Sequence, residues 1–117
     1  MASRGAETGD DADETIIRGT GNLFADLGYA DAEERQTKLR LAHAINDVIA
    51  RQRLTQAAAA EKLGINQPKV SALANYKLDG FSVERLMIFL TALDRDVEIL
   101  IKKKPRSRAG RISVVAA

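Results

Sequence analysis

The chain has 117 residues, which is enough for one compact domain with tails, since single domains commonly run to about 100–200 residues. Hydrophobic residues make up 45% of the chain and aromatic residues only 4%, and there is no cysteine. The missing cysteine excludes disulfides and thiolate metal sites and fits a reducing compartment. No apolar run approaches the roughly 18–20 residues that span a bilayer, and the acidic, polar N-terminus is unlike a signal peptide. We therefore expect a cytoplasmic protein.

The formal net charge of +2 conceals an asymmetry between the two parts of the chain. Residues 1–34 carry nine acidic side chains against two basic ones, whereas residues 35–117 carry sixteen basic side chains against seven acidic ones. A basic body attracts the phosphate backbone of a nucleic acid. The acidic part must then lie away from that face or bind something else.

The N-terminal third divides into two stretches before the first long helix. Residues 1–14 are small, polar and acidic with no apolar period, so we expect a disordered acidic tail. Residues 15–30, the N-terminal arm, mix apolar side chains with three glycines, a density that argues against a long helix. Those apolar side chains need a surface to dock on, either this body or a partner. The candidate contact residues are Leu23, Phe24, Leu27 and Tyr29.

Two helices are predicted over the next thirty or so residues. The first begins at Asp31, which has Glu34 at capping-box spacing, and should end near residues 52–54. Its apolar residues recur at three- and four-residue steps and form one face: Leu41, Ala42, Ile45, Val48 and Ile49. The second helix covers residues 56–63, with Thr55 as its cap and Gly64 as its stop.

Two further helices follow. Asn66 caps the third, Pro68 lies in its first turn, where a missing N–H is harmless, and Val70 and Leu73 form its inner face. The fourth opens at Ser82 and carries an apolar stripe. Phe81 before that cap and Leu86 after it have the spacing of a hydrophobic staple.

The period of the sequence changes at residues 96–102, where apolar residues alternate and predict a single β-strand. One strand alone has two unpaired edges, so it needs a partner. That partner is either the N-terminal arm or the same strand of a second subunit. In the second case Val97, Ile99 and Ile101 form the dimer contact. Residues 103–117 form a basic tail whose apolar end has no firm explanation in the sequence.

Residues 54–77 have the pattern of a DNA-reading unit. Two short helices joined by a tight glycine-containing turn hold the second helix at a fixed angle, so that its N-terminal half can enter the major groove. Amide side chains there can make bidentate contacts to adenine, and lysine and serine can bind bases or phosphates. The candidate DNA-binding residues are Gln56, Asn66, Gln67, Pro68, Lys69, Ser71, Asn75, Tyr76 and Lys77.

This stretch resembles the helix-turn-helix of the lambda-repressor/Cro-like (XRE) regulators, whose pattern is L-T-Q-x-x-x-A-x-x-L-G-[IV]-x-[QS]-x-x-[IV]-S. The matching residues are Leu54, Thr55, Gln56, Ala60, Leu63, Gly64, Ile65, Gln67, Val70 and Ser71. Residues 21–28, 80–82, 84–86, 90–93 and 96–99 are similar to the HigA-type antitoxins of that superfamily. Many relatives carry an arginine where this chain has Ala72, so base readout should depend more on Gln67 and Lys69.

The resemblance implies an all-α, lambda-repressor-like helix-turn-helix bundle of four to five helices plus one C-terminal β-strand over residues 31–102. It also implies a homodimer that binds a double-stranded DNA operator, represses its own operon and, as the antitoxin of a type II pair, neutralises a small basic ribonuclease toxin. The N-terminal arm is then the candidate toxin contact. Two alternatives are a solitary XRE-family regulator without a toxin and a protein-interaction module with vestigial DNA binding.

The residues give no support for an enzyme, a metal or a cofactor. No paired carboxylates fall in an apolar stretch, and no glycine-rich phosphate loop follows a strand. His43, the single histidine, has no second ligand at a suitable spacing, so we interpret it as structural.

Overall fold

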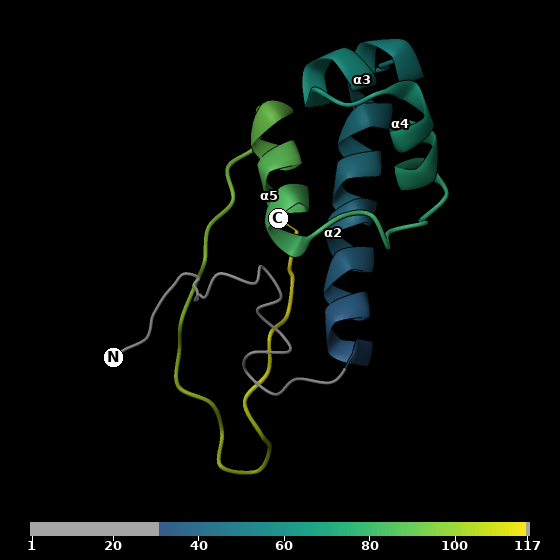
Figure 1. The fold of residues 1–117 in the computed structure, drawn as a ribbon. Coiled ribbons are helices and arrows are strands. Elements are labelled where there is room, and N and C mark those ends of the chain that lie inside the picture. The colour runs from purple at the N-terminus through teal and green to yellow at the C-terminus, as the bar shows by residue number, and fades with distance from the viewer. Residues whose placement is uncertain (1–30, 117) are drawn as a thin grey trace.

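The computed structural model describes residues 31–116, and the candidate arm residues Leu23, Phe24, Leu27 and Tyr29 lie outside them. The described part contains four helices: α2 (Asp31–Arg51), α3 (Gln56–Leu63), α4 (Gln67–Ala74) and α5 (Val83–Ala92). In Figure 1, α3 and α4 lie at the end of α2 where α2 finishes, and α5 runs alongside α2. The predicted all-α helix-turn-helix bundle is confirmed. None of these helices is long and apolar enough to cross a membrane.

Helix α2 is the scaffold, and its buried positions follow the apolar period of the sequence. Leu41, Ala42, Ile45 and Val48 are all buried on one face. The ion pair of Arg51 Nε with Asp47 Oδ2, at 2.8 Å, lies on its exposed side, where such pairs add little stability. The helix ends one residue before the predicted range.

Both short helices are capped at the predicted residues. The Thr55 hydroxyl accepts a hydrogen bond from the Ala58 N–H at 3.1 Å, and the Asn66 side-chain oxygen accepts one from the Lys69 N–H at 2.9 Å. Gly64 ends α3 in the left-handed conformation at a φ of 71°, and its N–H donates to carbonyls of the last turn. Only glycine adopts this φ without a steric cost, which explains the stop at this residue.

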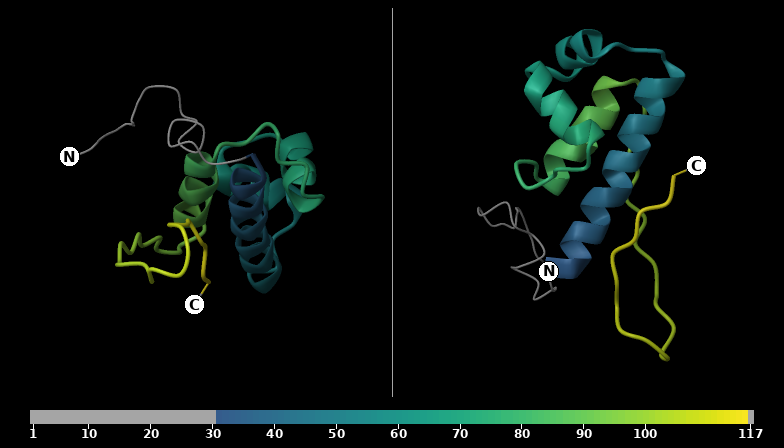
Figure 2. Two further views of the ribbon diagram at one scale, coloured as in Figure 1. Left: turned by 90° about the horizontal axis from the view of Figure 1, so that it is seen from below. Right: turned by 90° about the vertical axis from the view of Figure 1, so that its right-hand side faces the viewer.

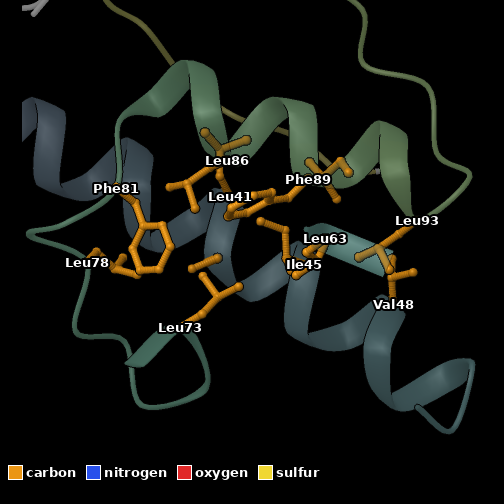
Figure 3. Packing of buried hydrophobic residues seen from close by; sticks show 12 residues of the cluster. Leu41, Ile45, Val48, Leu63, Leu73, Leu78, Phe81, Leu86, Phe89 and Leu93 are labelled. Atoms are coloured by element: carbon orange, nitrogen blue, oxygen red, sulfur yellow. The ribbon is translucent and has the colours of Figure 1, made fainter. Parts of the chain in front are cut away.

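The main core lies between α2, α4 and α5, and Leu63 joins it from the end of α3; Figure 3 shows these side chains converging. The largest fully buried side chains are Phe89, Ile45, Leu73, Leu86 and Leu93. Phe81 packs edge-to-face on Phe89, with ring centroids 5.9 Å apart. Phe81 and Leu86 are both buried in this cluster on either side of the Ser82 cap, which agrees with the predicted staple.

The predicted β-strand over residues 96–102 is absent from the described structure. The segment is extended, but among the described residues no backbone hydrogen bond joins residues 96–116 to any other. A ladder needs a second strand, and a lone extended run has none. Residues 95–116, which we call the C-terminal arm, run away from α5, turn at 106–108 and come back, so that the tip points away from α3 and α4 (Figures 1 and 2). Val97 and Val114, one from each run, pack against the main core.

Candidate nucleic-acid interface

A small second core fixes the angle between α3 and α4. It consists of Ala59, Ala60 and Val70, with Leu54 and Ile65 packed on its edge. Ala59 is fully buried, and because its side chain is a single methyl group, α4 can lie close against α3. Ala59 and Ala60 therefore serve packing, and Ile65 and Val70 fill the corner between the helices from inside.

Helix α2 holds the C-terminal end of α4 through two polar side chains. The Asn46 side-chain amide donates a hydrogen bond of 3.1 Å to the carbonyl oxygen of Leu73. His43 Nδ1 lies 3.4 Å from the hydroxyl of Tyr76. Asn46 is not among the residues predicted from the sequence. Its position was the available signal, because a polar amide among the apolar residues of a helix needs a partner when it packs inside.

One face of α4 stays open to solvent. Gln67, Pro68 and Lys69 are exposed, and Ser71 is half-buried one turn after Gln67, on the same face. Ala72 is half-buried and packs against the main core, so it contributes no polar group to this face. Among the described residues, the Gln67 amide and the Ser71 hydroxyl on this face make no side-chain hydrogen bond within the protein, and the backbone of α4 is held from behind.

Three predicted contact residues already make contacts within the protein. The Asn66 oxygen caps α4. The Asn75 amide donates 2.9 Å to the Ser71 carbonyl. The Lys69 ammonium lies 5.6 Å from the centroid of the Phe81 ring, a cation–π contact that orients its side chain. The amide group of Asn66 and the charge of Lys69 remain available, whereas Asn75 mainly closes the end of the helix.

The start of α3 offers backbone donors. Thr55 takes the N–H of Ala58, and the N–H groups of Gln56 and Ala57 bond to no other described residue. Gln56 is exposed beside them. Such free N–H groups, with a side-chain amide, suit a phosphate oxygen. At the other end of the unit, Tyr76 has a φ of 58° and is exposed, as is Lys77.

The comparisons with known proteins agree with this geometry. A family model described as a helix-turn-helix domain matches residues 23–102. A solved structure described as an XRE family transcriptional regulator is 79% identical, with a TM-score of 0.72, and the match covers 75% of this chain and 100% of that one. The chain belongs to the XRE family of helix-turn-helix transcriptional regulators. The comparison with curated proteins gave no match.

The matched range includes residues 54–77, the segment that contains α3 and α4. In this XRE-family protein the second helix of the motif is α4 and the first is α3. The match also extends upstream to residue 23 and downstream to residue 102, so it includes part of the N-terminal arm and the first run of the C-terminal arm. The matched domain thus takes in residues 23–30 of the N-terminal arm and residues 95–102 of the C-terminal arm.

Proposed function

We propose that this protein is a sequence-specific repressor that inserts α4 into the major groove of its operator. The observation that carries the proposal is the open face of α4, where Gln67 and Ser71 are presented by a helix fixed from behind. Gln67 reads a base, because a glutamine amide matches the donor and acceptor of adenine. Gln56, Lys69 and Lys77 contact phosphates, which sets the affinity and its dependence on salt.

The regulator acts as a homodimer. One short helix reads few base pairs, and helix-turn-helix proteins bind two half-sites about one helical turn apart. The proposed contact is the first run of the C-terminal arm, where Ile99 is 77% and Ile101 is 90% exposed while Val97 packs against its own core. Exposed aliphatic side chains of this size favour burial against a second protein surface.

We further propose that the regulator is the antitoxin of a type II toxin–antitoxin pair. The support is the similarity of residues 21–28, 80–82, 84–86, 90–93 and 96–99 to HigA-type antitoxins, together with the acidic charge of residues 1–34, which suits a basic ribonuclease. Leu23, Phe24, Leu27 and Tyr29 are the proposed toxin anchors. Deletion of residues 1–30 should then abolish toxin binding and leave operator binding in place. If the truncated protein still bound the toxin, the N-terminal arm would not be the toxin contact.

A gel shift with the DNA upstream of its own gene tests the DNA-binding proposal directly. We expect a discrete complex that survives excess non-specific competitor. Equal binding to unrelated DNA would contradict sequence-specific repression and favour an interaction module. Co-purification of the untagged protein with the product of the neighbouring gene distinguishes an antitoxin, which carries a small basic protein with it, from a solitary regulator, which does not.

A further inference from the structure

The first run of the C-terminal arm has an unpaired backbone and an apolar surface. Among the described residues, no backbone hydrogen bond reaches residues 96–104, and Leu100 is 80% exposed between Ile99 and Ile101. An extended segment of this kind is a template for another strand. The pattern of its charges indicates which strand that is.

The charges along this run are arranged symmetrically about Leu100. Two positions before it is Glu98 and two positions after it is Lys102. Four positions before it is Asp96 and four positions after it is Lys104. Each of these acidic residues before Leu100 thus has a basic residue at the same distance after Leu100. A strand with this property is complementary in charge to a second copy of itself that runs in the opposite direction.

We propose that residues 96–104 of two copies pair as an antiparallel ribbon with its two-fold axis at Leu100. This inference rests on the homodimer proposed above and gives its register. Leu100 then lies opposite Leu100 of the second copy, and Ile99 lies opposite Ile101 of the second copy. Glu98 faces Lys102 of the second copy, and Asp96 faces its Lys104.

The two faces of the ribbon divide by residue parity, because successive side chains in a strand point to opposite faces. The odd positions 97, 99 and 101 are apolar, and Lys103, opposite Val97 of the second copy, closes each end of this face. Val97 already packs against the main core of its own chain, so this face turns toward the two helical bodies. The even positions form a face of cross-strand ion pairs around the central Leu100 pair. Opposite-charge pairs at such positions stabilise a sheet.

Neighbouring registers match the side chains less well. A two-fold axis at Ile99 places Leu100 opposite Glu98 of the second copy, and an axis at Ile101 places it opposite Lys102. A parallel arrangement brings Lys102, Lys103 and Lys104 of both copies together, where like charges directly opposite one another are destabilising. Only the axis at Leu100 pairs apolar with apolar and acid with base at every position from 98 to 102.

A cysteine scan tests the register, since the natural chain has no cysteine. Directly opposite residues of an antiparallel pair have Cα atoms about 4.5–5.5 Å apart, within the range of about 4.4–6.8 Å that a disulfide spans. We expect Leu100→Cys to give a disulfide-linked dimer on mild oxidation. Ile99→Cys and Ile101→Cys should each stay unlinked alone, because the diagonal distance is about 7–8 Å. An equimolar mixture of these two variants should cross-link.

The outcomes of the scan separate the register from the dimer itself. Cross-linking of Ile99→Cys alone, with none for Leu100→Cys, would overturn the proposed axis. If no variant cross-links while light scattering still reports a dimer that binds the operator, the ribbon is wrong and the dimeric regulator stands. A natural protein that is monomeric and does not bind the operator would contradict both the ribbon and the dimeric regulator.

A charge exchange gives a second test that does not depend on a disulfide. In a symmetric dimer, Glu98→Lys or Lys102→Glu places like charges opposite one another twice, so each variant should weaken dimerisation about tenfold or more. The double variant, E98K with K102E, restores both pairs and should return to within about threefold of the natural protein. Failure of the double variant to recover would indicate another occupant of the run, such as the chain's own residues 15–30.

Discussion

The side-chain amide of Asn46 on α2 donates a 3.1 Å hydrogen bond to the carbonyl oxygen of Leu73 near the end of α4. The same oxygen also accepts from the backbone N–H of Tyr76 at 3.1 Å. One scaffold side chain thus holds α4 from behind, close to its C-terminal end. The orientation of α4 depends on this bond as well as on the two apolar clusters.

Replacement of this amide should loosen α4. Asn46→Ala removes one of the two donors to the Leu73 oxygen, so we expect a loss of about 1 kcal/mol in the free energy of unfolding, measured with urea. Asp47→Ala is the matched control, because it gains the same helix propensity but breaks only an exposed ion pair with Arg51. Equal effects of the two changes would show that the Asn46 bond contributes nothing.

Gly64 is predicted to be needed for its backbone conformation alone. A Cβ added there would meet nothing within 4 Å, but the φ of 71° strains any other residue. Gly64→Ala should therefore lower the stability by about 1 kcal/mol. Gly80 has equally open space and no such φ. Gly80→Ala should change stability by less than about 0.5 kcal/mol, and a cost similar to that of Gly64→Ala would contradict the conformational explanation.

Replacement by alanine should have very different effects on the free energy of unfolding at two residues of α5, Leu86 and Ile88. Leu86 is fully buried in the main core, whereas Ile88 is 61% exposed. Leu86→Ala should cost about 2–5 kcal/mol, because it leaves a cavity between α2 and α5. Ile88→Ala should cost less than about 0.5 kcal/mol. Thermal and urea unfolding of both variants would measure the difference, and a large cost at Ile88 would mean that a partner covers it in solution.

The proposed DNA-contacting residues should fall into two groups by their effect on specificity. Gln67→Ala should cost about 1–3 kcal/mol on the operator, relax the preference at one base pair and leave non-specific binding unchanged. Lys77→Ala should weaken binding to all sequences and reduce the salt slope by about 1. Titration of operator and random DNA at several salt concentrations separates the groups. If Gln67→Ala weakened both DNAs equally, it would be a phosphate contact.

Local sequence signals predicted most of the fold correctly. The caps Thr55, Asn66 and Ser82 and the stop at Gly64 all act within three or four residues of themselves. The structure confirms each of them, because these hydrogen bonds and φ preferences depend on neighbours along the chain and not on packing. The helix-turn-helix segment was recognisable for the same reason.

The prediction of a β-strand at residues 96–102 was wrong because a strand depends on hydrogen bonds to a second segment. The alternation of Val97, Ile99 and Ile101 is a genuine strand pattern, but a strand exists only when a second one supplies its hydrogen bonds. Among the described residues no such strand is present, so the run stays extended and unpaired. Sequence periodicity shows which side chains share a face and does not supply the partner.

For this protein, the sequence alone determined where helices begin and end, which faces are apolar and where the helix-turn-helix lies. The tertiary structure decided which candidate contact residues bond within the protein and which stay open to solvent. It showed that Asn66 and Asn75 are engaged in holding α4, that Gln67 and Ser71 share its open face, and that Asn46 fixes its far end. The physical reason is the distance along the chain over which each interaction acts. Caps and periodicity act between near neighbours in the sequence, whereas the hydrogen-bond partner of a polar side chain can be a residue that only folding brings close.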